Sequence, residues 1–237
     1  MVDTSSNSPG SDAPHDVITI HDLKKSYLLG EIEVPILHGI DLNVKKGEFV
    51  AIMGPSGSGK STLMNMIGCL DRPTSGSVRL MGKDTATISD NELAELRGFE
   101  IGFVFQNFNL IPRLSAYENV LLPTYSNSKK DIDAMQRAKD LLTLVGLDDR
   151  LYHKPTELSG GQRQRVAIAR SLINAPSLIL ADEPTGNLDS KTSEDIMGIF
   201  SELHGKGSTI VMITHDPEMK KYVDRVVLIK DGRIENN

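Results

Sequence analysis

One segment constrains the fold of this chain more than any other. It runs Gly54-Pro55-Ser56-Gly57-Ser58-Gly59-Lys60-Ser61-Thr62 and fits the phosphate-binding loop pattern G-x-x-x-x-G-K-[ST]. Residues 49–53 before it are an uninterrupted apolar run, and residues 63–67 after it are apolar at helical spacing. A strand, a glycine-rich loop and a helix bind phosphate because glycine lets the backbone approach closely and a helix N-terminus attracts anions. We therefore predict a nucleoside triphosphate site in which Lys60 reaches the β- and γ-phosphates and Ser61 ligates Mg²⁺.

The composition limits which partners the protein is expected to bind and which cellular compartment it is expected to occupy. The net charge of −6 disfavours a broad nucleic-acid surface, and the lack of Trp leaves little aromatic material for stacking on unpaired bases. The single cysteine, Cys69, lies in the apolar stripe after the loop, so we expect it in the core of a protein from a reducing, cytosolic compartment. No apolar run approaches about 18 residues, so we expect any membrane role to depend on a partner.

The hydrophobic pattern predicts an α/β fold behind a polar tail. Residues 1–16 are rich in Ser, Asp, Pro, Asn and Gly, which predicts a disordered tail before a folded unit at 17–237. Alternating segments at 17–23 and 36–44 predict an antiparallel β layer. Apolar strands alternating with helices predict a mainly parallel sheet covered on both faces, and the pattern between about 107 and 174 is helical.

Polar residues stand at the carboxyl ends of several predicted strands, where such sheets bind their ligands. They are Gln106, Asp182, Glu183 and His215. We expect Asp182 to bind Mg²⁺ directly or through water, and Glu183 to take the proton of an attacking water. His215 is expected to hydrogen-bond the γ-phosphate or that water. The alternative for each is a surface residue at a strand end, and His215 judged by itself is the most open to that interpretation.

The segment Leu158-Ser159-Gly160-Gly161-Gln162 makes the prediction more specific, because it resembles the signature sequence of ATP-binding-cassette (ABC) ATPases. Together with the other motifs, the chain from about residue 17 to its end resembles one complete ABC nucleotide-binding domain. This resemblance implies a P-loop core, an N-terminal antiparallel layer and a helical signature subdomain. It also implies that Tyr27 stacks on adenine beside Val34, that Gln106 contacts Mg²⁺ and couples to a membrane protein, that Asp189 contacts an opposite subunit and that His215 is the switch histidine.

The resemblance further implies a dimer. In that family, the signature of one subunit closes over ATP held by the P-loop of another. The helix that Ser159, Gly160, Gly161 and Gln162 open would attract anions at its N-terminus. In a monomer of this topology, that helix end is expected to lie far from the P-loop. We therefore expect ATP to bridge a head-to-tail homodimer.

Several motifs indicate a subfamily. Residues 52–65, 67–71, 102–106, 108–112 and 181–189 resemble the ATPases of the lipoprotein-release and macrolide-exporter group. This resemblance implies an ATP-hydrolysing transporter subunit, held on the cytoplasmic face of the membrane by an integral membrane permease. The alternatives are an ATPase that regulates a membrane partner in cell division, and a soluble ABC ATPase acting on DNA or ribosomes. The acidic charge and the lack of a coiled-coil insertion or tandem cassette disfavour the soluble alternative.

Overall fold

The computed structural model describes residues 16–126 and 133–235. Almost all of the predicted tail at 1–16 therefore lies outside the described residues, as does most of a polar stretch at 126–131. None of the helices in the two described ranges has the length and apolar character needed to cross a bilayer.

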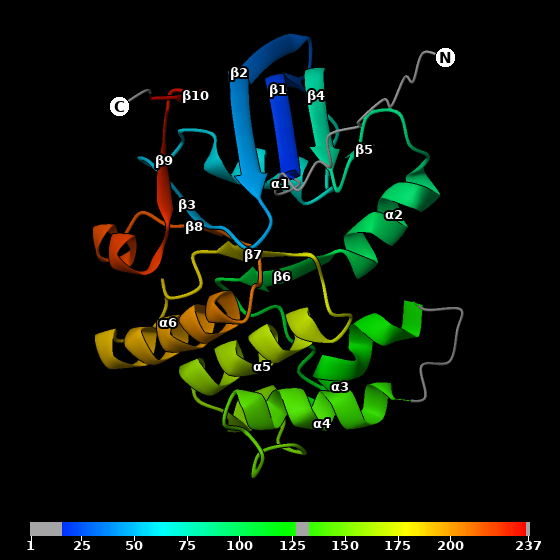
Figure 1. The fold of residues 1–237 in the computed structure, drawn as a ribbon, viewed down its shortest axis with the longest axis vertical. Coiled ribbons are helices and arrows are strands. Elements are labelled where there is room, and N and C mark those ends of the chain that lie inside the picture. The colour runs from blue at the N-terminus through cyan, green and yellow to red at the C-terminus, as the bar shows by residue number, and fades with distance from the viewer. Residues whose placement is uncertain (1–15, 127–132, 236–237) are drawn as a thin grey trace, which may run out of the picture.

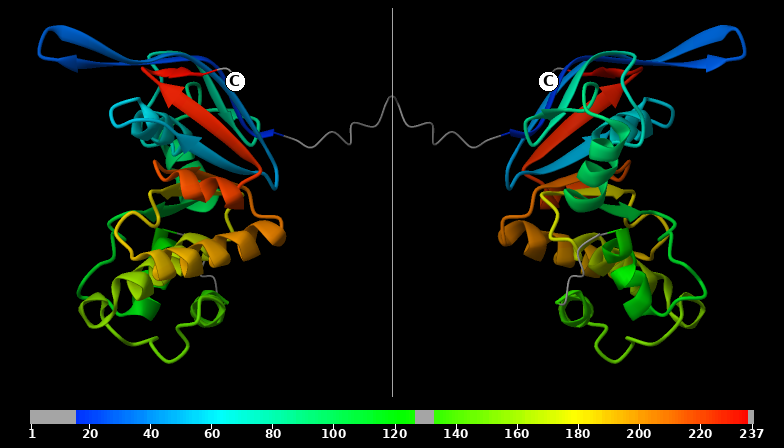
Figure 2. Two further views of the ribbon diagram at one scale, coloured as in Figure 1. Left: turned by 90° about the vertical axis from the view of Figure 1, so that its left-hand side faces the viewer. Right: turned by 90° about the vertical axis from the view of Figure 1, so that its right-hand side faces the viewer.

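An antiparallel sheet forms the N-terminal layer, as the sequence predicts. Its strands are β1 (Asp16–Leu29), β2 (Ile32–Lys45), β4 (Ser75–Leu80) and β5 (Lys83–Asp84), in the order β2-β1-β4-β5. The first two strands are longer than the alternating pattern suggests, because they continue as a two-stranded hairpin that projects from the body (Figure 2). Apolar residues at the hairpin tip, among them Leu28 and Leu29, are exposed, so the in-out alternation that reveals a half-buried strand is absent there.

The central sheet is mainly parallel, which confirms the predicted fold class. Its strands are β3 (Phe49–Met53), β6 (Ile101–Phe105), β7 (Leu178–Asp182), β8 (Ile210–Ile213), β9 (Arg225–Lys230) and β10 (Arg233–Ile234), in the order β10-β9-β3-β8-β7-β6. Only the β9–β10 hairpin pairs antiparallel. Because β3, β6, β7 and β8 run in the same direction, their carboxyl ends lie along one edge of the sheet.

Four of the six α-helices in the described ranges begin at a side-chain cap. The six are α1 (Lys60–Ile67), α2 (Asp90–Phe99), α3 (Ala116–Leu121), α4 (Ala134–Leu144), α5 (Gly160–Leu172) and α6 (Ser190–Gly205), with short 3₁₀ turns at Leu122–Ser126, Pro155–Glu157 and Pro217–Tyr222. Ser89, Ser115 and Ser159 each close a capping box with the residue three positions later. These boxes satisfy backbone N–H groups that a helix start otherwise leaves unpaired.

Two hydrophobic cores enclose the central sheet. Val50 and Ile52 of β3 face one core, which they share with α1 and the antiparallel layer. This core also contains Cys69, which is 1% exposed. Phe49 and Ala51 face the opposite core, where α3, α4, α5 and α6 cover the sheet (Figure 1). Both faces of β3 are therefore packed, which gives the loop that follows it a fixed base.

Candidate functional site

The loop between β3 and α1 is tightly folded and depends on glycine. A Cβ on Gly54 would lie 2.0 Å from the Ile229 carbonyl oxygen, so no larger residue fits there without backbone movement. Gly59, the residue before α1, has a φ of +101°, and a Cβ on it would lie 2.9 Å from Leu37 Cδ2. The loop is further held by a hydrogen bond from the Gly232 N–H to the Ser58 carbonyl, at 3.0 Å. This geometry leaves the start of α1 open to a ligand.

Lys60 folds back over this loop. Its side chain is largely buried, and Nζ donates hydrogen bonds to the carbonyl oxygens of Gly54 at 2.9 Å and Pro55 at 2.8 Å. An ammonium group has three donors, so these two bonds fix its direction and leave one donor for a further acceptor. The Lys60 cation thus lies at the phosphate-binding loop, where an anion would need it.

The residues at the strand ends meet this loop around one cavity of about 710 Å³, a volume in the range of small-molecule sites. Gln106 follows β6, Asp182 is the last residue of β7 and Glu183 follows it, and His215 lies just beyond β8. All four line the cavity. The other walls are Ile36, Gly54, Pro55, Ser56, Gly57, Gly59, Lys60, Ser61, Thr62 and Ile213. The parallel topology therefore brings together residues that are far apart in the sequence.

The two carboxylates lie in different environments. Burial raises the pKa of Asp182, the neighbouring charge of Glu183 raises it further, and Lys60 acts in the opposite direction. Glu183 has a left-handed backbone, with a φ of +44°, and its N–H donates to the Ile213 carbonyl at 2.9 Å. Oε1 of Glu183 lies 2.7 Å from His215 Nδ1, which is hydrogen-bond distance. The Glu183 side chain is therefore fixed at two points, through its backbone and through His215.

Gln106 is connected to the loop after β7. Its Nε2 donates to Asn187 Oδ1 at 3.5 Å, and Asn187 Nδ2 donates to the Gln106 carbonyl at 3.2 Å. Gly186 allows this approach, because a Cβ there would lie 2.7 Å from Gln106 Nε2. The sequence does not reveal the part that Gly186 and Asn187 play in holding Gln106, because nothing in it relates them to a residue 80 and 81 positions earlier.

The donor set at the cavity suits Mg²⁺. Ser61, Gln106 and Asp182 present oxygen atoms from three different side-chain types, and all line the cavity. In the described ranges no group of three or more His, Cys, Asp or Glu side chains is arranged to hold a metal by itself. Mg²⁺ fits such a sparse oxygen set, because it keeps several waters and takes further ligands from substrate phosphates.

The signature residues stand apart from this cavity. Ser159 caps α5, and its Oγ accepts the Gln162 N–H at 3.2 Å. Gly161 packs against the start of α6, where a Cβ on it would lie 2.4 Å from Thr192 Cγ2. Thr192 in turn donates side-chain and backbone hydrogen bonds to Asp189, which hold the pKa of that carboxyl below its usual range. The residues of 159–162 do not line the loop cavity, so within one chain they form a second surface with Asp189.

Tyr27 and Val34 also lie outside the cavity lining. They pair across the β1–β2 hairpin. Burial and the Asp71 carboxylate raise the pKa of Tyr27, and a hydrogen bond with the Thr62 side chain lowers it. The Tyr27 hydroxyl therefore lies next to the last residue of the phosphate-binding loop.

A family model described as ABC transporter matches residues 37–186, which include the loop, the signature and the strand-end carboxylates. This chain belongs to the ABC transporter family. It is an ATP-binding domain of that family and therefore an ABC ATPase.

Individual relatives of this ABC ATPase agree with the family assignment. It is 59% identical to the uncharacterized ABC transporter ATP-binding protein YvrO of Bacillus subtilis, over 92% of this chain and 95% of that protein. It is 55% identical to the macrolide export ATP-binding/permease protein MacB of Syntrophobacter fumaroxidans, over 93% of this chain but only 31% of that larger protein. Among solved structures, a dimeric post-hydrolysis state of the ATP-binding cassette MJ0796 bound to ADP and Pi matches with a TM-score of 0.84 and 46% identity, covering 92% of this chain and 97% of that one.

Gln164 is a further residue of this ABC ATPase that sequence analysis missed. It is fully buried in α5, and its Nε2 donates to the Pro184 carbonyl at 2.7 Å, which joins the signature helix to the loop after β7. The run Gln162-Arg163-Gln164-Arg165 is polar throughout, so its pattern indicates a solvent-facing turn. Only the tertiary contact distinguishes Gln164 from its neighbours.

Proposed function

We propose that this chain is the ATP-binding and ATP-hydrolysing subunit of an ABC transporter of the export or lipoprotein-release type. In this proposal it drives a separate integral membrane permease through ATP-dependent head-to-tail dimerisation. The observation that carries the proposal is the division of the functional residues between two surfaces. The phosphate loop and the strand-end residues share one cavity, whereas Ser159 to Gln162 lie elsewhere in the same chain.

The cavity side is suited to hold the nucleotide. Lys60 and the backbone of residues 54–62 would bind the β- and γ-phosphates, with the positive end of α1 directed at the same charge. Ser61, Gln106 and Asp182 would hold Mg²⁺. The chemistry that Mg²⁺ supplies when bound is neutralisation of the charge on the phosphate oxygens. Tyr27 and Val34, on the hairpin next to Thr62, would contact the adenine.

Hydrolysis needs a base and a fixed direction of attack. Glu183 would accept the proton of the attacking water, and His215, within 2.7 Å of its Oε1, would hold the carboxylate in place. Gln106, held by Asn187, would orient the same water and report the state of the site to the permease. Phosphoryl transfer depends mainly on positioning and charge stabilisation, which these contacts are suited to provide.

The second surface would complete the site of another copy. The N–H groups at the start of α5 are directed away from the chain's own helix, as at any helix N-terminus, and would bind the γ-phosphate held by the partner. Asp189, at the start of α6, would contact the opposite subunit beside it. The dimeric state of the similar cassette MJ0796 supports this arrangement. Two copies would therefore enclose two ATP molecules.

The membrane partner is the remaining part of the proposal. Macrolide export relatives such as MacB are named ATP-binding/permease proteins, and this chain corresponds to 31% of one of them. The match to YvrO covers 95% of the length of YvrO, which is therefore a precedent for an ATP-binding protein of similar length. We place the chain on the cytoplasmic face of the membrane, bound through a permease, with residues 107–174 as its helical subdomain.

The variant Glu183→Gln tests the sandwich mechanism. It keeps the shape of the side chain but removes the base, so we expect it to bind ATP, hydrolyse it slowly and accumulate as a dimer. Light scattering after size exclusion, with and without saturating ATP, measures the dimer fraction. The double variant Lys60→Ala/Glu183→Gln is the control and should stay monomeric. A Glu183→Gln variant that remains monomeric at saturating ATP would contradict the proposal.

A further inference from the structure

Lys25 is a buried cation outside the cavity. It lies on β1 with a side-chain exposure of 11%, and its Nζ donates to Asp71 Oδ1 at 2.8 Å and to the Arg72 carbonyl at 2.8 Å. The same Nζ lies over the ring of Tyr27, 4.8 Å from its centroid. A carboxylate, a carbonyl and an aromatic face thus surround the ammonium group. Such a buried charge is kept only where its partners are fixed.

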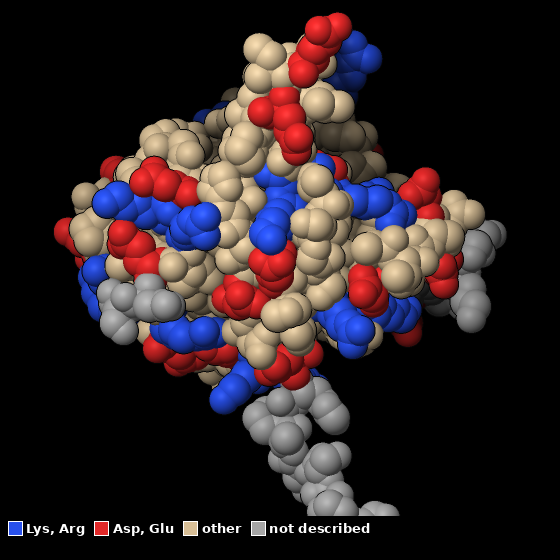
Figure 3. All heavy atoms as spheres, turned by 90° about the horizontal axis from the view of Figure 1, so that it is seen from above, with Lys and Arg blue, Asp and Glu red and all other residues tan. Residues whose placement is uncertain are grey.

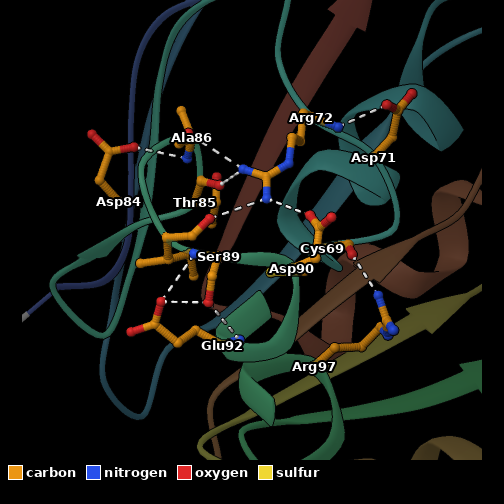
Figure 4. A network of polar contacts seen from close by, with 11 residues as sticks. Cys69, Asp71, Arg72, Asp84, Thr85, Ala86, Ser89, Asp90, Glu92 and Arg97 are labelled. Carbon is orange, nitrogen blue, oxygen red and sulfur yellow. Dashed lines mark hydrogen bonds and ion pairs between the residues drawn. The ribbon is translucent and has the colours of Figure 1, made fainter. Parts of the chain in front are cut away.

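The partners of Lys25 are themselves fixed. Asp71 Oδ1 also accepts the Arg72 N–H at 2.7 Å. The Arg72 guanidinium donates to the Thr85 carbonyl at 2.8 Å, the Ile88 carbonyl at 3.1 Å and Asp90 Oδ1 at 2.8 Å (Figure 4). The segment that follows α1 is therefore tied to the start of α2. It forms a platform on which the Asp71 carboxylate has little freedom.

Tyr27 is held between this platform and the phosphate-binding loop. Lys25 covers one face of its ring, and the side chains of Asp71 and Thr62 both interact with its hydroxyl, the first raising and the second lowering the pKa of Tyr27. The residue nevertheless remains 36% exposed, on a hairpin that protrudes from the body (Figure 3). Thr62, in the first turn of α1, thus holds the Tyr27 hydroxyl. Asp71, in the segment that follows the C-terminus of α1, holds the ring together with Lys25. This exposed fraction leaves ring surface on which a second flat ring can stack.

We propose that Lys25 and Asp71 are positioning residues that hold the Tyr27 ring in the orientation that receives the nucleotide base. This inference rests on the proposed function, in which Tyr27 contacts adenine. A cation over one face of an aromatic ring fixes the ring by electrostatic attraction, and a ring that is already ordered loses less entropy when a base stacks on it. Neither residue lines the cavity of the phosphate-binding loop, so we expect their contacts to act on the base, and their charges alone to act at long range on the phosphates.

Two variants of opposite charge test the proposal in the full-length chain. Lys25→Met removes a positive charge and Asp71→Asn removes a negative one, so their long-range effects on phosphate binding have opposite signs. Calorimetric titration with ATP and with tripolyphosphate, which has no base, separates the two contributions. We expect both variants to lower the ratio of ATP affinity to tripolyphosphate affinity about 3- to 10-fold. Both should also raise the KM for ATP while kcat stays unchanged.

The exposed pair Lys24–Asp22, at 2.9 Å on the same strand, provides the matched control, and Lys24→Met should leave the affinity ratio unchanged. In a Tyr27→Ala background, neither test variant should lower the ratio further.

Two results would overturn the positioning role: an equal loss of affinity for ATP and for tripolyphosphate, or a further fall of the ratio in the Tyr27→Ala background. If Tyr27→Ala alone leaves the ratio unchanged, the base assignment fails while the phosphate site stands. If the unaltered chain binds neither ligand, the proposed function itself is wrong.

Discussion

His215 Nδ1 lies 2.7 Å from Glu183 Oε1, so residues that follow two neighbouring strands are joined side chain to side chain. Glu183 is the better covered of the two, with a side-chain exposure of 23% against 67% for His215. The histidine therefore lies on the outer side of the pair, where a second subunit would meet it. In the proposed mechanism, His215 would hold the carboxylate and would also respond to what covers the cavity.

Removal of the imidazole should separate binding from hydrolysis. In His215→Ala, Glu183 keeps its backbone position but loses the partner that fixes its side chain. We expect ATP affinity within about twofold of the unaltered chain and a fall in phosphate release of about 10²-fold, the lower range for a misplaced base. His21→Ala is the matched control, because His21 Nδ1 lies 2.8 Å from Asp41 in an exposed pair that does not line the cavity. If ATP affinity falls as much as the rate, His215 has no specific catalytic role.

A methyl group on Gly186 should disturb Gln106. The added Cβ would lie 2.7 Å from Gln106 Nε2, the end of a flexible side chain, so the glutamine moves and the fold is retained. We expect Gly186→Ala to lower kcat about 10- to 100-fold with little change in melting temperature. Gly198→Ala is the control, because Gly198 lies within α6 and a Cβ on it would meet no atom of another element within 4 Å, so it should leave kcat unchanged. If kcat is unchanged in Gly186→Ala, hydrolysis does not require the Gln106 side-chain amide at its present position.

The sequence predicts this site better than it predicts the contacts that support it. The phosphate loop, Asp182, Glu183 and the caps at Ser89, Ser115 and Ser159 follow from local pattern, because strand, glycine and cap preferences act over a few residues. The length of the β1–β2 hairpin cannot be predicted from the local pattern, because its exposed tip lacks the alternation of apolar and polar residues. Nor can the burial of Lys25 and Gln164, because their partners at Asp71 and Pro184 are 46 and 20 positions away. Polar residues with distant partners look like surface residues in a sequence.

Cys69 should be unreactive in the folded chain. Burial raises the pKa of its thiol to about 11, although Arg97 and Arg72 oppose the shift. Because the folded pKa lies above the unfolded one, this group stabilises the fold fully below about pH 9 and ceases to do so as the pH rises to about 11. We expect no alkylation by iodoacetamide at pH 8 without denaturant and complete alkylation in urea. In Cys69→Ala, the free energy of unfolding should fall less steeply between pH 9 and 11.

Gly161 and Thr192 are in contact between the signature helix and the start of α6. A Cβ on Gly161 would lie 2.4 Å from Thr192 Cγ2, but 3.8 Å from its Cβ and 3.9 Å from its Oγ1. The clash therefore involves a single methyl group. The Thr192 hydroxyl donates to Asp189 Oδ2 at 2.6 Å, so a displaced Thr192 also releases the aspartate.

This contact predicts a loss and its rescue. Gly161→Ala should displace Thr192 and cost about 1–3 kcal/mol of stability, and it should reduce ATP-dependent dimerisation, because the signature and Asp189 surfaces both shift. ATP affinity of the monomer should be unchanged, since the cavity is elsewhere. Adding Thr192→Ser removes the clashing methyl and keeps the hydroxyl that bonds Asp189, so the double variant should regain stability and dimerisation. Thermal melting and light scattering with ATP in the Glu183→Gln background measure both. A double variant that regains its melting temperature but not its dimer would assign Gly161 a direct contact with the nucleotide instead of a packing role.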